Sequence, residues 1–214
     1  IWIKNPLAIY TPDGVGAGGG IVIEQHQIAE LVPKGADPAT PCDTDFNAGS
    51  HVVLPGLINT HHHFYQTLTR AVPAACGKEL FNWLKVLYNI WKNLTPAHIA
   101  ASSQLALAEL LLSGCTTASD HHYVFPAGLE QAIDLQIAEA AKLGIRVAVT
   151  RGSMSLSVED GGLPPKSVVQ SDAVILADSE RLIEKYHQSG PGAMVQVILA
   201  PCSPFSVSEK LMAE

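Results

Sequence analysis

From Leu54 onward, apolar strand-like runs alternate with helical runs, and this order restricts the possible folds more than any other feature of the sequence. The strand-like runs are apolar almost throughout, as expected for strands that are buried on both faces of a parallel sheet. Four such runs occur, at residues 51–61, 115–123, 145–152 and 195–202. The pattern therefore predicts an α/β fold built on a parallel sheet.

Residues typical of helix ends lie between these strands. Thr95 suits an N-cap, whereas Gly114 and Gly144 suit the position just after the last turn of a helix. A capping box formed by Ser206 and Glu209 predicts one more helix after the fourth strand.

The number of strand–helix units sets the size of the predicted sheet. A (β/α)8 barrel of the TIM type needs about 250 residues and eight such units. We therefore expect residues 55–214 to be the first half of such a barrel, truncated within this sequence. Residues 1–54 are expected to be the N-terminal part of a small β-sandwich domain. An open, doubly wound sheet is the structural alternative.

Residues 1–54 contain short β-like runs. The stretch Ile21–Leu31 shows partial alternation of apolar and polar residues. Just before it, residues 14–19 formally match G-x-G-x-x-G, but the phosphate-binding form of this motif must open a helix. Here it leads into the β-branched run IVIE, so we predict a loop without a nucleotide site.

Charge and cysteine content limit the classes of partner. The formal net charge is −7 without a Lys/Arg cluster, which argues against a nucleic-acid partner. No apolar run approaches the roughly 20 residues of a membrane span. The four cysteines include no C-x-x-C pair and are expected to be reduced, mostly buried thiols. We expect a cytoplasmic homo-oligomer that acts on a small molecule.

Three consecutive histidines, His61 to His63, follow the first apolar strand run. Because strand side chains alternate, His61 and His63 should point to one side and His62 away from them. Imidazoles at positions i and i+2 can both reach one divalent ion at about 2.0–2.1 Å. The alternative is a pair of core histidines with satisfied ring nitrogens, but H-x-H at a strand end favours the metal.

The ends of the other three predicted strands also carry polar side chains, and function in a parallel barrel gathers at the carboxyl ends of its strands. These side chains are Asp120, His121 and His122, then Arg151, then Cys202 and Ser203. His121 and His122 could each line a pocket or hydrogen-bond loop backbone, and the sequence favours neither.

The run Pro55–Arg70, PGLINTHHHFYQTLTR, resembles the first barrel strand of the amidohydrolase superfamily, which carries P-G-apolar-apolar-[Asn/Asp]-x-His-x-His. The stretches CTTASDHHY, AVTRGSMS and APCSPFSVS are similar to the aminohydrolase branch that acts on nitrogen heterocycles. Within this branch the likeness is greatest to 8-oxoguanine (isoxanthine-type) deaminases. Hydroxyatrazine and triazine hydrolases are near relatives.

The resemblance implies a metal-dependent hydrolytic deaminase of a purine-like heterocycle. His61 and His63 would be ligands of one Zn²⁺ per subunit, with Fe²⁺ as the alternative. Metal-bound hydroxide would attack the amino-bearing ring carbon and ammonia would leave. The family pattern also needs a third His, an Asp, an H-x-x-E glutamate and a further His, all expected after residue 214. No catalytic acid or base is therefore identified in this sequence.

Three further residues, besides His122, are candidates for substrate contact. The Gln66 amide can pair with a lactam edge or cap a loop. The Arg151 guanidinium can bind a ring carbonyl or form an ion pair with Asp120 or Glu159. Trp83 can stack on a flat ring or pack in the core.

Two other functions stay open on the sequence alone. The same chemistry with a different leaving group would make the protein a triazine or hydroxyatrazine amino- or chlorohydrolase. A non-catalytic metal-binding half-barrel is a third possibility, because the remaining ligands are not in this sequence.

Overall fold

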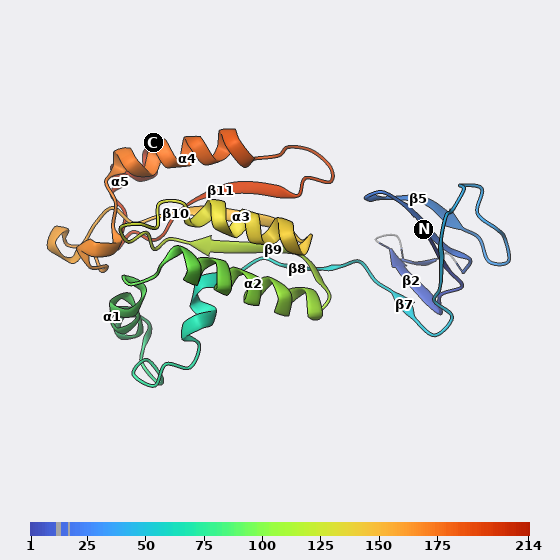
Figure 1. Ribbon diagram of the computed structural model, residues 1–214, viewed down its shortest axis with the longest axis horizontal. Coiled ribbons are helices and arrows are strands. Elements are labelled where there is room, and N and C mark those ends of the chain that lie inside the picture. The colour runs from blue at the N-terminus through green and yellow to red at the C-terminus, as the bar shows by residue number, and fades with distance from the viewer. Residues whose placement is uncertain (12–13, 17) are drawn as a thin grey trace. The chain divides into compact units, whose positions relative to one another are not determined.

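The computed structural model describes residues 1–11, 14–16 and 18–214, and these residues form two compact units (Figure 1). One unit spans Ile1–Gly56 and the other Leu57–Glu214. The candidate site residues all lie in the second unit, so the first is described briefly.

The first unit consists of two small sheets. One sheet has the order β5-β4-β1-β6 and the other has the order β3-β2-β7. Their bounds are β1 Trp2–Lys4, β2 Ala8–Thr11, β3 Gly14–Gly16, β4 Gly20–Glu24, β5 Gln27–Val32, β6 Asp45–Asn47 and β7 Val52–Val53. The buried apolar side chains of this unit are Ile9, Ile21, Val22, Val32 and Ala48.

Two sequence expectations in the first unit need correction. The partly alternating stretch Ile21–Leu31 is a hairpin, not one strand, because the chain reverses after Gln25, whose φ is +53°. Gly14–Gly16 is a strand paired antiparallel with β2, not a loop, and Ala17 lies outside the described residues. The residues that directly follow the motif, Gly20–Glu24, form strand β4 rather than a helix.

The second unit contains a four-stranded parallel sheet with the order β8-β9-β10-β11. The strands are β8 Leu57–Asn59, β9 Cys115–His122, β10 Arg146–Ser153 and β11 Val195–Pro201. Their order in the sheet follows their order in the chain, whereas a doubly wound sheet reverses at a switch point. The α/β prediction and the partial barrel are therefore confirmed, and the doubly wound alternative is wrong.

Helices connect these strands and cover the sheet (Figure 1). Helix α2 contacts β9, α3 contacts β10, and α4 contacts β11. The helices are η1 Phe64–Thr69, α1 Leu80–Trp91, α2 Pro96–Leu112, α3 Ala132–Leu143, η2 Val158–Asp160, η3 Lys166–Val168, α4 Asp172–Tyr186 and α5 Glu209–Ala213. Among the described residues, no helix is both long and apolar enough to cross a membrane.

The predicted helix ends are mostly found where the sequence indicates them. Thr95 caps α2 by accepting a hydrogen bond from the His98 amide at 3.4 Å. Gly114 and Gly144 follow α2 and α3 with φ of +87° and +71°, the left-handed region that favours glycine. The predicted capping box is wrong, because Ser208 caps α5 instead.

Burial in β9 alternates between its two faces. Ala118, Asp120 and His122 are buried, whereas the intervening Ser119 and His121 are only half-buried.

The prediction of mostly buried cysteines is wrong, because only Cys115 is fully buried and Cys76 is exposed, although all four are free thiols.

Candidate functional site

The carboxyl end of β9 holds the three consecutive histidines in place. The His121 amide donates to the His62 carbonyl at 2.8 Å, and the His63 ring donates from Nδ1 to the His121 carbonyl at 2.7 Å. On the preceding side, the His61 amide donates to Oδ1 of Asn59, at the end of β8, at 3.2 Å. Backbone and side-chain contacts from two neighbouring strands thus fix this segment.

The contact with His121 sets the tautomer of His63. A carbonyl oxygen only accepts hydrogen bonds, so His63 must carry its proton on Nδ1 and keep a lone pair on Nε2. Burial lowers the pKa of His63 to about 4, against a smaller opposite effect of the hydrogen bond to His121. The ring is therefore neutral at neutral pH, which is the form that binds metals.

His61 and His63 lie next to each other, as the alternation predicted. Their ring centroids are 5.1 Å apart and the ring planes are nearly perpendicular, at 87°. The His62 ring instead lies 5.2 Å from the Phe64 ring. Two adjacent imidazoles, one with its Nε2 lone pair free by tautomer, fit a shared divalent cation. Within the described ranges, no group of three or more His, Cys, Asp or Glu side chains could hold a metal.

Asp120 is a fully buried carboxylate that contacts the chain just after the histidine segment, His61–His63. It accepts hydrogen bonds from the Phe64 amide at 2.5 Å and from Nε2 of Gln136, on α3, at 2.6 Å. Burial raises the pKa of Asp120 to about 7, although these two hydrogen bonds oppose the rise. Gln136 was not singled out from the sequence, whereas Asp120 was considered as a polar strand end and as an ion-pair partner of Arg151.

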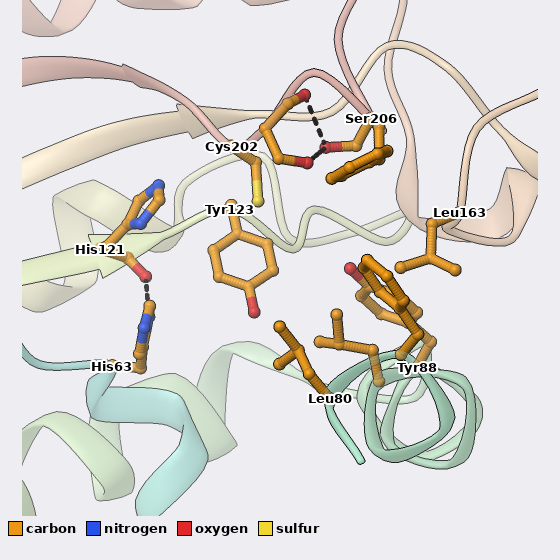
Figure 2. A pocket seen from close by; sticks show the side chains of 12 residues that line it. His63, Leu80, Tyr88, His121, Tyr123, Leu163, Cys202 and Ser206 are labelled. Atoms are coloured by element: carbon orange, nitrogen blue, oxygen red, sulfur yellow. Dashed lines mark hydrogen bonds between the residues drawn. The ribbon is translucent and has the colours of Figure 1, made fainter.

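A cavity of about 300 Å³ adjoins His63 and His121 (Figure 2). Figure 2 shows Tyr123 between these histidines and the side chains of α1, with its hydroxyl toward the cavity. One face of α1 and the segment after β11 supply most of the remaining lining. These lining residues are Leu80, Phe81, Leu84, Tyr88, Leu163, Cys202, Ser203, Phe205 and Ser206. The lining is mainly apolar and aromatic, which is typical of small-molecule sites.

Two predicted substrate contacts, Gln66 and Trp83, lie at a neighbouring cavity of about 300 Å³ that is also lined by His63. The Gln66 amide donates to the Tyr65 and Tyr123 hydroxyls, each at 3.3 Å. Gln66 thus contacts Tyr123, which lines the first cavity, but is not itself part of that lining. Trp83 packs edge-on against Trp91, with the ring centroids 5.6 Å apart.

Arg151 lines neither of these two cavities, contrary to its prediction as a substrate contact. Its side chain is fully buried, and Nε donates to Asp178 at 2.5 Å. A second nitrogen donates to Gln170 at 2.7 Å, and the guanidinium lies 3.9 Å from the centre of the Phe125 ring. The alternative of an ion pair is thus observed, but its partner is Asp178, which the sequence did not indicate.

His122 also lines neither cavity, in contrast to its prediction as a substrate contact. Its ring is fully buried, with Nε2 donating to the Val124 carbonyl at 2.8 Å. Burial lowers the pKa of His122 to about 3, so it is neutral. The histidine that reaches the cavity is His121, on the opposite face of β9.

Tyr123 was missed as a cavity residue, whereas Cys202, named from the sequence only as part of a polar strand end, also lines the cavity. Tyr123 directly follows β9, and its ring centroid lies 5.6 Å from that of His63 and 5.2 Å from that of His121. A tyrosine one residue past a polar strand end is the sequence signal that could have indicated it. Burial raises the pKa of the Cys202 thiol, so it is protonated at neutral pH.

Comparison with curated proteins gives two informative relatives. An 8-oxoguanine deaminase from Pseudomonas aeruginosa is 60% identical over 211 residues, which are 99% of this chain and 47% of that protein. A hydroxydechloroatrazine ethylaminohydrolase from Pseudomonas sp. (strain ADP) is 34% identical over 87% of this chain and 41% of its own length. The chain thus spans about half the length of these relatives.

A solved structure supports the same grouping. Atrazine chlorohydrolase TrzN from Arthrobacter aurescens TC1, crystallised with zinc, matches with a TM-score of 0.90 and 27% identity. The match covers 98% of this chain and 48% of TrzN. Residues 52–214 match the Amidohydrolase family, which confirms the resemblance found at Pro55–Arg70. The chain therefore belongs to the amidohydrolase family.

Proposed function

We propose that the protein containing this chain is a metal-dependent aminohydrolase that removes the amino group of a purine-like heterocycle such as 8-oxoguanine. The observation that carries the proposal is the pair of adjacent imidazoles, His61 and His63, next to an apolar cavity. The 60% identity to an 8-oxoguanine deaminase supports the choice of ring.

His61 and His63 are the residues of this chain that would hold the metal, with further ligands supplied from outside it. When bound, Zn²⁺ lowers the pKa of a coordinated water toward about 7, which provides a nucleophile at neutral pH. His63 suits this role because its hydrogen bond to His121 fixes both its orientation and its tautomer. Zn²⁺ is the proposed metal, with Fe²⁺ as the alternative.

The cavity residues would bind and orient the ring. Leu80, Leu84 and Tyr88 from α1 present an apolar wall that excludes water and suits a flat, uncharged heterocycle. Burial raises the pKa of Tyr123, so its hydroxyl keeps its proton and can donate to a ring carbonyl. We propose that Gln66, which donates to that hydroxyl, orients Tyr123 and offers its own carbonyl to the substrate.

The test is ammonia release from 8-oxoguanine by the zinc-loaded full-length protein. We expect turnover by the parent protein, and a loss of kcat/KM of at least about 100-fold in His63→Ala, more than loss of an outer-shell partner costs. His26→Ala, an exposed histidine of the first unit, is the matched control and should behave as the parent. A zinc-loaded protein inert toward purines and triazines alike would contradict the proposal.

A second candidate is hydrolysis of a substituted triazine. The TM-score of 0.90 to atrazine chlorohydrolase TrzN and the 34% identity to the ethylaminohydrolase favour it. The attack on the ring would be the same, and only the leaving group would differ. Comparing kcat/KM for 8-oxoguanine, hydroxyatrazine and atrazine distinguishes the two, and we expect 8-oxoguanine to be the best substrate.

The proposed setting is the cytoplasm, because all four cysteines are free thiols and would stay reduced there. A homo-oligomer remains our prediction for the assembly. Light scattering on the full-length protein measures its molar mass, and a monomer would contradict this prediction.

A further inference from the structure

We propose that Asp120 and Gln136 form a positioning pair that holds His61 and His63 in their metal-binding arrangement. The inference rests on the proposed function, because it assigns these residues to the same metal site. Neither residue lines the cavity or is a candidate ligand, so the pair acts through the histidine segment.

The pair is connected to the histidines through the Phe64 amide. Phe64 directly follows His63 and is the first residue of η1, and its amide donates to Asp120 Oδ1 at 2.5 Å. The second Asp120 oxygen is held by Gln136 Nε2 at 2.6 Å. Both residues are fully buried, so water cannot replace either partner.

The Asp120 carboxylate is the part of this contact that a substitution can remove. The other two hydrogen bonds from the end of β9, between the His121 amide and His62 and between the His121 carbonyl and His63, use the backbone of His121. They persist in any variant that keeps the strand. The Asp120 side chain instead holds the amide of Phe64, where the chain passes from His63 into η1.

A role in packing alone does not explain a carboxylate at this position. An apolar residue of similar size would avoid the cost of burying an ionisable group. Among the described residues, no cationic side chain pairs with Asp120. The hydrogen bonds that Asp120 accepts come from the Phe64 amide and the Gln136 side chain. What the carboxylate provides is a pair of acceptors aimed at one backbone amide and one side-chain amide.

Glu139 provides a matched control on the same helix as Gln136. It is a buried carboxylate that accepts from a glutamine amide, Gln104 Nε2, at the same distance of 2.6 Å, and its other oxygen pairs with the exposed Lys142 at 2.7 Å. The contact with Gln104 joins α2 to α3 and does not involve the histidine segment. Loss of Glu139 therefore reproduces the loss of a buried hydrogen-bonded carboxylate without the proposed positioning effect.

The experiment measures Zn²⁺ affinity of the full-length apo-protein by competition with a chromophoric chelator, alongside the free energy of unfolding. We expect Asp120→Leu to weaken Zn²⁺ binding about 10-fold or more, as for loss of an outer-shell partner. Asp120→Asn should bind Zn²⁺ with an affinity within about threefold of the parent's. The side-chain oxygen of Asn can still accept the hydrogen bond from the Phe64 amide, so the contact that orients the histidines is kept. The Gln136 amide can turn to accept from Asn, since its Oε1 has no partner among the described residues.

Glu139→Leu should lose stability but keep the parent's Zn²⁺ affinity. If Asp120→Leu does not fold, Gln136→Leu replaces it and should weaken Zn²⁺ binding in the same direction. Parent-like affinity in the folded Asp120→Leu or Gln136→Leu protein, or equal losses in Glu139→Leu, would overturn the positioning role. The variant His63→Ala distinguishes a failure of the positioning role from a failure of the proposed function. If His63→Ala kept the parent's Zn²⁺ affinity, the proposed metal site itself would be wrong.

Discussion

The ionisation of Asp120 is expected to make the stability of the fold depend on pH. Its pKa is about 7 in the folded protein and 3.8 in its ordinary state, because the charged form is buried. The unfolded chain therefore releases this proton at lower pH than the folded one. The stability associated with the protonated form is fully present below about pH 4 and is lost as the pH rises to about 7.

Asp120→Asn should remove this pH dependence. Relative to the parent, the free energy of unfolding of the variant should rise between pH 4 and pH 7, by on the order of a few kcal/mol. Denaturant unfolding of the two metal-free proteins at several pH values measures the difference between their free energies of unfolding. The contributions of the other ionisable groups, which both proteins share, cancel in this difference. A difference that stays constant over this range would show that Asp120 is ionised normally in the folded state.

Single-residue prediction succeeded where spacing alone decides and failed where tertiary structure decides. His61 and His63 could be paired because alternation needs only their positions in the chain. The choice between His121 and His122 could not be made, since it depends on which face of β9 borders the cavity. Arg151, on strand β10, was misassigned because its partner, Asp178, lies 27 positions away on helix α4.

At the level of elements, the Arg151 ion pair joins β10 to α4. Replacing Arg151 by Met should leave Asp178 with Arg181 alone and lower the free energy of unfolding by about 3 kcal/mol. Arg146→Met, at the start of the same strand, is the control, because among the described residues Arg146 forms no ion pair and donates to the Ala193 carbonyl and, at 3.4 Å, to the Thr117 hydroxyl. Its cost should be about 1 kcal/mol.

Urea denaturation gives both stability values, and steady-state kinetics of the full-length variants gives KM. We expect Arg151→Met to leave KM unchanged, since the residue lines neither cavity beside His63. A raised KM with parental stability would restore Arg151 as a substrate contact.

Gly144 ends α3 in a conformation that other residues adopt at a cost. A Cβ at this position would meet no atom within 4 Å, so Gly144→Ala tests backbone conformation without a steric clash. We expect a loss of about 1 kcal/mol. Gly144→Asn should cost less, because Asn tolerates the left-handed region. Thermal unfolding of the two variants checks the order, and equal costs would contradict it.

The elements with strong end signals were the ones that could be predicted from sequence. Thr95 marked the start of α2 and Gly144 the end of α3 to within a residue or two, because caps act locally. The hairpin in residues 20–32 was missed because its two-residue turn, Gln25 and His26, lacks the Asn or Gly that marks such turns. The capping box at Ser206 was wrong because Ser206 is buried and bonded to Ser203, which leaves the cap to Ser208.

At the scale of the whole molecule, the sheet has two outer strands that pair on one side only within the described residues. Both carry exposed apolar side chains, Leu57 and Ile58 on β8 and Ile198 and Leu199 on β11. A barrel closes by pairing such edges, so these rows mark where further strands would pair. The sequence predicted this partial barrel because each strand–helix unit is a local pattern, whereas closure depends on residues elsewhere.

The central claim is that the imidazoles of His61 and His63 share one divalent cation beside the cavity. The most direct measurement is anomalous scattering at the zinc absorption edge from crystals of the zinc-loaded full-length protein. We expect one strong peak within bonding distance of both rings, with His63 bound through Nε2. A peak elsewhere, or rings that bind no metal while the protein holds zinc, would contradict it.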